Sequence, residues 1–251
     1  MFTNRKPLYG RAILWIALVA LPFGYPANGW SINIDSFDQL VQTLATNAAM
    51  LSDSNELLNG ASVGGERDVK LMQTTPDGTT GVSVNGIDPG FFDYQTSFSA
   101  QGMTEITWDG PDGSPALDTD GLMNLNLLAD GATAFVLDYG SDHAADFTFT
   151  VHSGGNSSTK MVTLGPSGLT QTLIPFNMFA GTADFMDVGA IQLHISSETN
   201  DATDVVIDFI GTNGVPNGHS SVPEPGTFAL AALAGLLAAC AGRRRERKAP
   251  D

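Results

Sequence analysis

The segment Phe147-Thr148-Phe149-Thr150-Val151-His152 (147–152) alternates apolar and polar side chains without interruption. Successive side chains of an extended strand point to opposite faces, so this alternation predicts a strand that lays one face on an apolar core. The same pattern recurs further along the chain, at Ile191, Leu193 and Ile195 and at Val205, Ile207 and Phe209. Strands with one apolar and one polar face are typical of antiparallel sheets.

Shorter segments of strand character, separated by Gly, Asp, Ser and Asn, surround these three. They cover 68–73, 81–85, 104–108, 133–139, 160–164 and 170–174. Many short strands with frequent turn residues predict an all-β fold, an antiparallel β-sandwich that occupies residues 30–212. In 37–44, by contrast, apolar side chains recur at helical spacing behind Ser36, a residue type that caps helices. This part of the chain predicts one short helix.

The middle of the chain is strongly acidic. Residues 30–221 hold 24 Asp and Glu but only three basic residues, Arg67, Lys70 and Lys160, which gives a formal charge of −21. Such a surface repels nucleic acid and anionic lipid, so nucleic acid is excluded as a partner. The charge is compatible with divalent cations, with neutral glycans, or simply with solubility. The single cysteine, Cys240, lies outside this region, so no disulfide is expected there.

Residues 1–29 have the three parts of a secretory signal peptide. Arg5, Lys6 and Arg11 precede the apolar run 12–23, and small residues follow it. This order predicts export across the inner membrane, and the run is shorter than the ~20 residues that a spanning helix needs. The alternative interpretation is a buried helix of the folded domain.

Residues 222–251 contain three elements in order. Pro223-Glu224-Pro225 is followed by the uncharged run 226–242 and then by the basic cluster Arg243-Arg244-Arg245-Glu246-Arg247-Lys248. The run predicts a single transmembrane helix, because a helix satisfies its own backbone hydrogen bonds in lipid. The basic cluster stays cytoplasmic by the positive-inside rule, so the acidic domain lies across the membrane from it. The Asn-, Gly-, Pro- and Ser-containing segment 213–221 is interpreted as a flexible stalk.

This three-part order resembles the PEP-CTERM sorting signal. In that family the signal is read by exosortase, a membrane-embedded cysteine transpeptidase, in bacteria that make exopolysaccharide and often grow as biofilm or floc. The resemblance implies that Pro223, Glu224 and Pro225, with the arginines 243–245, form a sorting signal. It also implies exosortase and, transiently, the inner membrane as partners, and delivery to the outer surface or extracellular matrix. An ordinary tail anchor with a chance Pro-Glu-Pro is the alternative.

Residues 30–212 also resemble the galactose-binding-like jelly-roll sandwiches of several carbohydrate-binding modules and of other PEP-CTERM proteins. The resemblance is carried, in the expected order, by 34–37 (IDSF), 64–69 (GGERDV), 108–110 (WDG), 174–179 (IPFNMF) and 206–210 (VIDFI). It implies a jelly-roll topology and a sugar-binding role. One fold hosts many functions, so any role has to be argued from a site.

The sequence contains no evident catalytic motif. The four histidines, His143, His152, His194 and His219, are scattered, and none belongs to an H-E-x-x-H or G-x-S-x-G motif. The many carboxylates single out no glycosidase pair. The chain is therefore interpreted as non-enzymatic, with a secreted hydrolase as the least favoured alternative. Arg67, a rare cation among many acids, is expected to be a partly buried ion-pair partner.

The densest acidic segment contains Asp109, Asp112, Asp118 and Asp120. Closely spaced aspartates and loop carbonyls supply the oxygen ligands that calcium prefers, so these four residues are candidate metal ligands. Their spacing does not fit an EF-hand, because no bidentate glutamate closes the loop. Aspartate and glycine also form turns without any ion, and this interpretation stays open.

A second candidate calcium site follows from the resemblance to galactose-binding-like sandwiches. Those proteins often hold a structural calcium where the two ends of the chain meet. Asp35, near the first strand, and Asp208, on the last one, are the acidic residues expected there. The excess of acidic residues also favours a bound cation, because like charges repel each other.

A glycan-binding surface needs exposed aromatic rings that stack on sugar rings. The candidates are Trp108, Tyr94 and Tyr139, with Phe91 and Phe92, and most of these residues are equally compatible with a core. Together with the two resemblances, the sequence predicts an exported, exosortase-processed protein of the cell surface or extracellular matrix of an exopolysaccharide-producing Gram-negative bacterium. Its expected role is structural or binding. A carbohydrate-binding module that engages a polysaccharide is the alternative.

Overall fold

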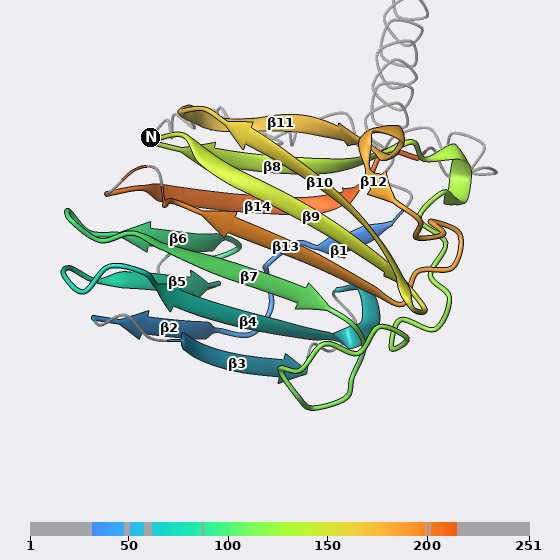
Figure 1. Ribbon diagram of the computed structural model, residues 1–251, viewed down its shortest axis with the longest axis horizontal. Coiled ribbons are helices and arrows are strands. Elements are labelled where there is room, and N and C mark those ends of the chain that lie inside the picture. Colours follow the sequence, from blue (N-terminus) through green and yellow to red (C-terminus); the bar gives the residue numbers. More distant parts are fainter. Residues whose placement is uncertain are drawn as a thin grey trace, which may run out of the picture. The chain divides into compact units, whose positions relative to one another are not determined.

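The computed structural model describes residues 32–47, 62–86, 88–198, 200 and 202–214, and the backbone course of 51–57. These residues form two antiparallel sheets whose strands are joined by turns and loops (Figure 1). The described helical turns are short 3-10 turns, at Val63–Gly65, Ala129–Gly131 and Phe176–Met178. The predicted signal peptide, the sorting signal and nearly all of the predicted stalk lie outside the described residues. Within the part described, no helix is long and apolar enough to cross a membrane.

Sheet A has the strand order β11-β8-β14-β6-β5-β2, and the short strand β1 pairs with β14. Its strands are β1 (Asn33–Asp35), β2 (Gln42–Thr46), β5 (Thr80–Val84), β6 (Phe92–Thr96), β8 (Ala134–Ser141), β11 (Ser167–Pro175) and β14 (Asp204–Thr212). β14 therefore lies inside the sheet, between β8 and β6. The first and last strands of the sandwich are neighbours, because Asn33 pairs with Gly211.

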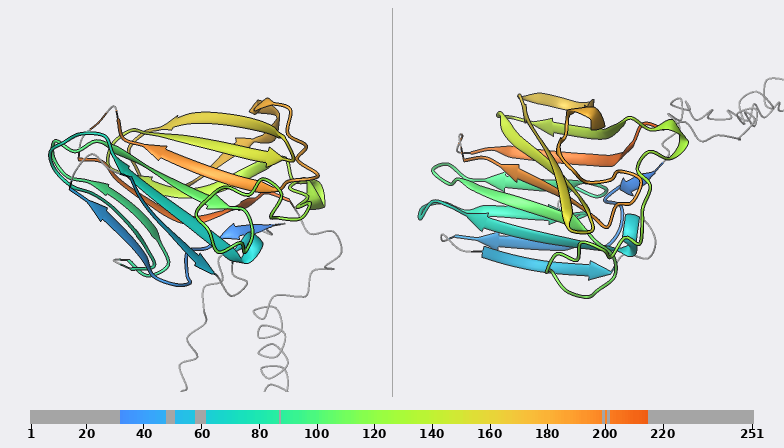
Figure 2. Two further views of the ribbon diagram at one scale, coloured as in Figure 1. Left: turned by 60° about the horizontal axis from the view of Figure 1, so that its bottom comes forward. Right: turned by 45° about the vertical axis from the view of Figure 1, so that its right-hand side comes forward.

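Sheet B has the order β12-β10-β9-β13-β7-β4-β3. Its strands are β3 (Leu51–Leu57), β4 (Glu66–Gln73), β7 (Gly102–Trp108), β9 (Ala145–Ser153), β10 (Asn156–Leu164), β12 (Ala180–Gly181) and β13 (Ala190–Ser196). The two further views show the sheets lying one over the other (Figure 2). The predicted all-β antiparallel sandwich is therefore confirmed.

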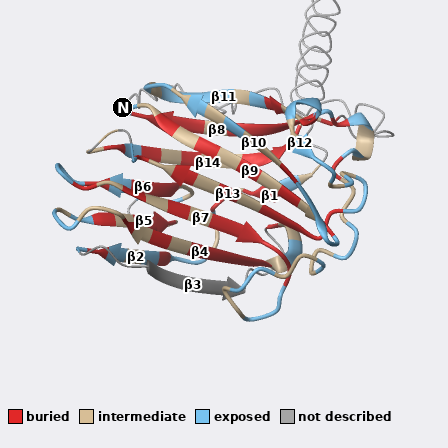
Figure 3. Ribbon diagram, in the orientation of Figure 1, coloured by how far each residue is buried: buried red, intermediate tan, exposed pale blue. Residues whose placement is uncertain are grey.

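The core lies between the sheets and follows the alternation read from the sequence (Figure 3). Along β9 the apolar residues Phe147, Phe149 and Val151 have no solvent exposure, whereas the residues between them are half-buried. The predicted inward positions on β13, Ile191, Leu193 and Ile195, are likewise fully buried. Aromatic rings fill the space between the sheets, and the Phe135 ring stacks on Phe149 with centroids 5.1 Å apart.

The prediction that Phe209 faces the core was wrong. β14 contains a register shift between Ile207, which pairs with Tyr139, and Phe209, which pairs with Asp138. Such a bulge inserts one extra residue and reverses the alternation beyond it. Ile210 therefore takes the fully buried position, and Phe209 is only half-buried.

The predicted helix at 37–44 is also absent. Phe37 and Leu40 have positive φ angles of 55° and 49°, and the chain then enters β2, which pairs with β5. A helix would direct the carbonyl groups here to amides one turn further on. Instead, the carbonyls of Gln39 and Leu40 accept hydrogen bonds from Arg67, at 3.3 and 3.5 Å. A contact with a residue distant in the sequence thus overrides the local periodicity.

Candidate functional site

Three carboxylates share one corner of sheet B, on its face away from the core. Asp68 of β4 pairs with Thr107 of β7, and Asp109 follows Thr107 by two residues. Residues two apart on a strand share a face, so Glu66, Asp68 and Asp109 point to the same side. Their neighbours Val69 and Trp108 point the other way, into the core.

The loop 110–121 folds back over this corner and closes it from solvent. The Gly113 amide donates to Glu66 Oε2 at 3.0 Å, and the Asp118 amide donates to Asp109 Oδ2 at 2.7 Å. At Gly121 the backbone passes so close that an added Cβ would lie 1.6 Å from the carbonyl oxygen of Asp109. As a result Glu66 and Asp68 have no exposed surface, and Asp109 is 1% exposed.

Two of these carboxylates have oxygen atoms that lack hydrogen-bond partners. Both oxygens of Asp68 and Oδ1 of Asp109 are buried and accept no hydrogen bond. Leaving a buried polar group unsatisfied costs about 1–3 kcal/mol, and more when the group is charged. This corner therefore contains three strong acceptor oxygens whose needs the described protein groups do not meet.

Burial and mutual repulsion raise the pKa of both groups. The pKa of Asp68 rises to about 8, chiefly because burial penalises the charged form and then because Asp109, Glu66 and Asp112 are nearby. Lys70 lowers it, but the Lys70 ammonium is paired with Glu105 at 3.2 Å. The pKa of Asp109 rises to about 6, again chiefly through burial, although the hydrogen bond from the Asp118 amide lowers it.

The other predicted ligands of the loop form turns. Asp112 Oδ1 accepts from the Ser114 amide at 2.8 Å, and Asp118 Oδ1 accepts from the Asp120 amide at 3.0 Å. These are the turns that aspartate typically makes with the backbone two residues on. Within the described ranges, no three His, Cys, Asp or Glu side chains already converge as metal ligands. Asp68 was missed because neither its burial nor the loop that covers it can be predicted from the sequence of its own strand.

The second predicted calcium pair is not brought together. Asp35 is buried and faces Arg67, whose Nη1 lies 3.0 Å from Asp35 Oδ2. Trp108 Nε1 donates to the same oxygen at 3.0 Å. Asp208 lies instead near Asp138 and Asp38, and burial with these two charges raises its pKa. The prediction that Arg67 is an ion-pair partner is confirmed, although its side chain is fully rather than partly buried.

The predicted glycan-stacking residues belong to the core. Trp108 and Tyr94 have no exposed surface, and Tyr139 is 6% exposed, so a sugar ring has no access to their faces. The Tyr94 hydroxyl is 2.9 Å from Ser197 Oγ, and the Tyr139 hydroxyl donates to the Gly165 carbonyl at 3.5 Å. This burial corrects the expectation that these three residues form a binding platform. Among the described aromatic residues, Phe98 is strongly exposed, at 80%.

The described histidines are paired or shielded, and they do not assemble with a nucleophile. His152 Nε2 is 2.9 Å from Gln192 Oε1, and Gln192 Nε2 donates to Thr107 Oγ1 at 3.2 Å. His194 is half-buried, and burial lowers its pKa. His143 lies at the surface beside Asp142, at 3.2 Å.

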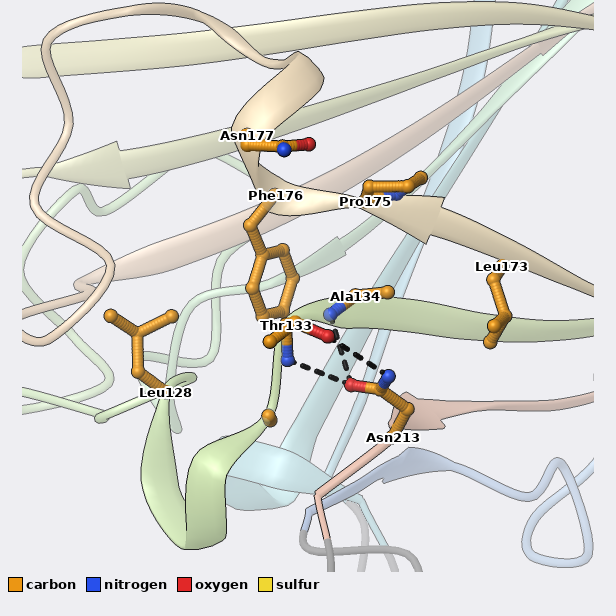
Figure 4. A pocket seen from close by; sticks show the side chains of 9 residues that line it. Leu128, Thr133, Ala134, Leu173, Pro175, Phe176, Asn177 and Asn213 are labelled. Carbon is orange, nitrogen blue, oxygen red and sulfur yellow. Dashed lines mark hydrogen bonds between the residues drawn. The ribbon is translucent and has the colours of Figure 1, made fainter.

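An apolar groove of about 470 Å³ lies where the described chain leaves the sandwich (Figure 4). Leu128, Leu173 and Phe176 line it, together with other residues that carry no titratable group. Asn213 closes one side, because its Oδ1 accepts from the amides of Thr133 and Ala134 at 2.8 and 3.0 Å. The groove therefore offers apolar contact and no acid or base.

Comparison with known proteins identifies one motif. The PEP-CTERM protein-sorting motif matches residues 221–248. The chain thus carries this motif, which indicates an exported protein that is anchored in a membrane and then processed. No curated protein sequence matches the chain.

Among solved structures, the chain is similar to a family 11 carbohydrate-binding module from Clostridium thermocellum in complex with a β-1,3-1,4-mixed-linked tetrasaccharide. The identity is 14%, over 74% of this chain and 97% of that module, with a TM-score of 0.38. A family 29 carbohydrate-binding module is similar at 7% identity, over 70% of this chain and 92% of that module, with a TM-score of 0.34. A likeness at this level assigns no function.

Proposed function

We propose that this chain is a non-enzymatic cell-surface or extracellular-matrix protein, exported from a Gram-negative cell and released from its inner membrane by exosortase. The observation that carries the proposal is the PEP-CTERM motif at 221–248, which follows a sandwich whose last strand ends at Thr212. In this arrangement the signal peptide delivers the acidic domain across the membrane, and the apolar run 226–242 holds it there until it is processed. The sandwich is then the delivered cargo.

The burial of the acidic residues supports a non-enzymatic role. A general acid or base has to reach the proton that it transfers, directly or through one water. Asp68 and Asp109 have raised pKa values, as catalytic carboxylates often do, but the loop 110–121 closes both from solvent. The apolar groove beside Asn213 holds no titratable side chain.

The test is to replace Pro223, Glu224 and Pro225 together by alanine in the native host. The two prolines keep this segment extended and accessible, so the variant is expected to be exported normally but not processed. Mass spectrometry and cell fractionation should find the precursor at the inner membrane. Pro216→Ala in the predicted stalk is the matched control and should mature as the wild type does. A triple variant with wild-type mass and location would refute the proposal.

Polysaccharide binding is a second candidate role, and one observation favours it. His152, Gln192 and Thr107 form a hydrogen-bonded row across β9, β13 and β7 on the outer face of sheet B. Thr107 is buried, so it orders the row from below, and the half-buried imidazole of His152 and amide of Gln192 are the groups available to sugar hydroxyls. A glycan array probed with the full-length chain should then show binding that Gln192→Ala removes and His143→Ala leaves intact. Absence of binding, or equal binding by both variants, would argue against this role.

A further inference from the structure

We propose that Asp68 and Asp109 bind one calcium ion beneath the loop 110–121. The two carboxylates lie diagonally across the β4–β7 pair, where side chains on one face are close neighbours. Asp68 offers both oxygens and Asp109 offers Oδ1, and none of the three has a protein partner. The site differs from the aspartate turns of the loop itself, because its anchoring residue is on a strand.

No basic side chain among residues 30–221 is left to neutralise this corner. Residues 30–221 contain only three basic side chains, Arg67, Lys70 and Lys160. The first pairs with Asp35 and the second with Glu105. The third is on β10, which two intervening strands separate from β7 in the sheet order. Two buried carboxylates beside a third, Glu66, therefore favour a bound cation at this corner.

The chemistry of the site fits calcium better than magnesium. Calcium takes about six to eight oxygen ligands in flexible geometry, including bidentate carboxylates, loop carbonyls and water. Asp68 presents a whole carboxylate and Asp109 one further oxygen, and water can complete the coordination shell of a calcium ion. Magnesium demands near-octahedral geometry and keeps most of its water, which a closed corner with paired carboxylates does not favour.

The loop gives the site a lid that is fixed at several points. It is tied to Glu66 through the Gly113 amide and to Asp109 through the Asp118 amide. An ion bound beneath the loop would connect β4, the end of β7 and the loop at one further point. Calcium should therefore stabilise the folded chain and hold this loop in place.

The experiment is thermal unfolding of the full-length chain in detergent, first in chelator and then in calcium. With calcium a hundredfold above its Kd, the melting temperature should rise by about 5–10 °C. Magnesium at matched ionic strength is the screening control and should raise it much less. Equilibrium dialysis should find one tightly held calcium per chain. Equal shifts with both ions, or no bound calcium, would overturn the proposal and leave protonation as the way Asp68 is neutralised.

Two substitutions locate the ion. Asp68→Asn keeps the shape of the side chain but removes the charge, so the calcium shift should be lost. Asp93→Asn is the matched control, because Asp93 is also a buried carboxylate with an unpartnered oxygen but lies on sheet A. It should retain the full shift.

A separate readout applies if Asp68→Asn does not fold. Terbium replaces calcium in oxygen sites, and Trp108, the residue before Asp109, should sensitise its emission. Calcium should displace the terbium from the wild-type chain, and Asp109→Asn should lower the emission. Emission unchanged in Asp109→Asn, or a calcium shift retained in Asp68→Asn, would refute the assignment.

Discussion

The Arg67 guanidinium joins both sheets through its ion pair with Asp35. Nη1 lies 3.0 Å from Asp35 Oδ2, and both side chains are shut off from solvent. Arg67 belongs to β4 of sheet B, whereas Asp35 belongs to β1 of sheet A. Arg67 Nε also donates to Gln42 Oε1 on β2 at 2.6 Å, and the guanidinium lies 5.7 Å from the centre of the Phe37 ring. One side chain thus compensates a buried charge and positions the start of sheet A.

Arg67→Met should destabilise the sandwich by about 3–5 kcal/mol, because it leaves the Asp35 carboxylate buried without its partner. Urea unfolding of the wild type and of Arg67→Met measures this difference in the free energy of unfolding. Lys160→Met is the control, since Lys160 is a half-buried residue of β10, and it should change stability by less than about 1 kcal/mol. Adding Asp35→Leu to Arg67→Met should recover part of the loss. If Arg67→Met and Lys160→Met lowered the free energy of unfolding by similar amounts, the Arg67–Asp35 ion pair would make no specific contribution to stability.

Asp93 should make the protein less stable as the pH rises from about 4 to about 6. Burial, and then the charge of Asp88, raises the pKa of Asp93 from 3.8 to about 6. The folded state therefore holds this proton more tightly than the unfolded chain, and that stabilising contribution is present at low pH and lost as the pH passes the folded pKa. The change amounts to at most about 3 kcal/mol.

Comparison with Asp93→Asn isolates this contribution from those of other acids. The stability of the variant minus that of the wild type should grow between pH 4 and 6 and then level off. Urea unfolding at a series of pH values gives this difference. A difference that does not vary with pH would mean that Asp93 titrates normally.

Gly121→Ala should loosen the loop 110–121. The new Cβ would lie 1.6 Å from the Asp109 carbonyl oxygen, so the backbone itself has to move. Overpacking of this kind costs about 1–3 kcal/mol. Hydrogen exchange should show faster exchange of the Gly113 and Asp118 amides. Gly155→Ala is the control, because nothing lies within 4 Å of its added Cβ, and it should leave both amides protected.

Replacing the basic residues in 243–248 with glutamine should prevent the precursor from being retained in the membrane during export. By the positive-inside rule such charges keep a segment on the cytoplasmic side, so we expect the short apolar run 226–242 to cross the membrane without them. Cell fractionation measures whether the chain is retained in the membrane, and protease protection shows on which side the tail lies. A matched variant that replaces them with lysine keeps the charge and should behave as the wild type. A glutamine variant that still stops normally would contradict the prediction.

The strands could be predicted from the sequence because their signal is local. Phe147, Phe149 and Val151 show the alternation within one segment, and burial on one face follows directly. Phe209 was misplaced because the bulge after Ile207 depends on how β14 pairs with β8. The helix expected at 37–44 failed because Arg67, distant in the sequence, takes the carbonyl groups that a helix would use.

Only one of the two residues of the candidate site could be predicted from the sequence. Asp109 stood out in a segment dense in aspartate, but Asp68 resembled an ordinary polar residue of a strand. Its isolation from water and from donors arises from the cross-strand position of Thr107 and from the path of the loop above it. Burial of Trp108 and Tyr94 was equally hidden, since an aromatic residue on a strand suits either a core or a surface.

The position of β14 between β8 and β6 determines how the domain resists mechanical load. A pull on the chain beyond Gly214 reaches the sandwich through Asn213, which is bonded to Thr133 and Ala134, and then through β14. A strand at the edge of a sheet can be peeled away one hydrogen bond at a time. β14 pairs with β8 on one side and with β6 and then β1 on the other, so hydrogen bonds on both of its sides have to break together. A domain attached to another structure through this strand can therefore stay folded while a force acts on its C-terminal end.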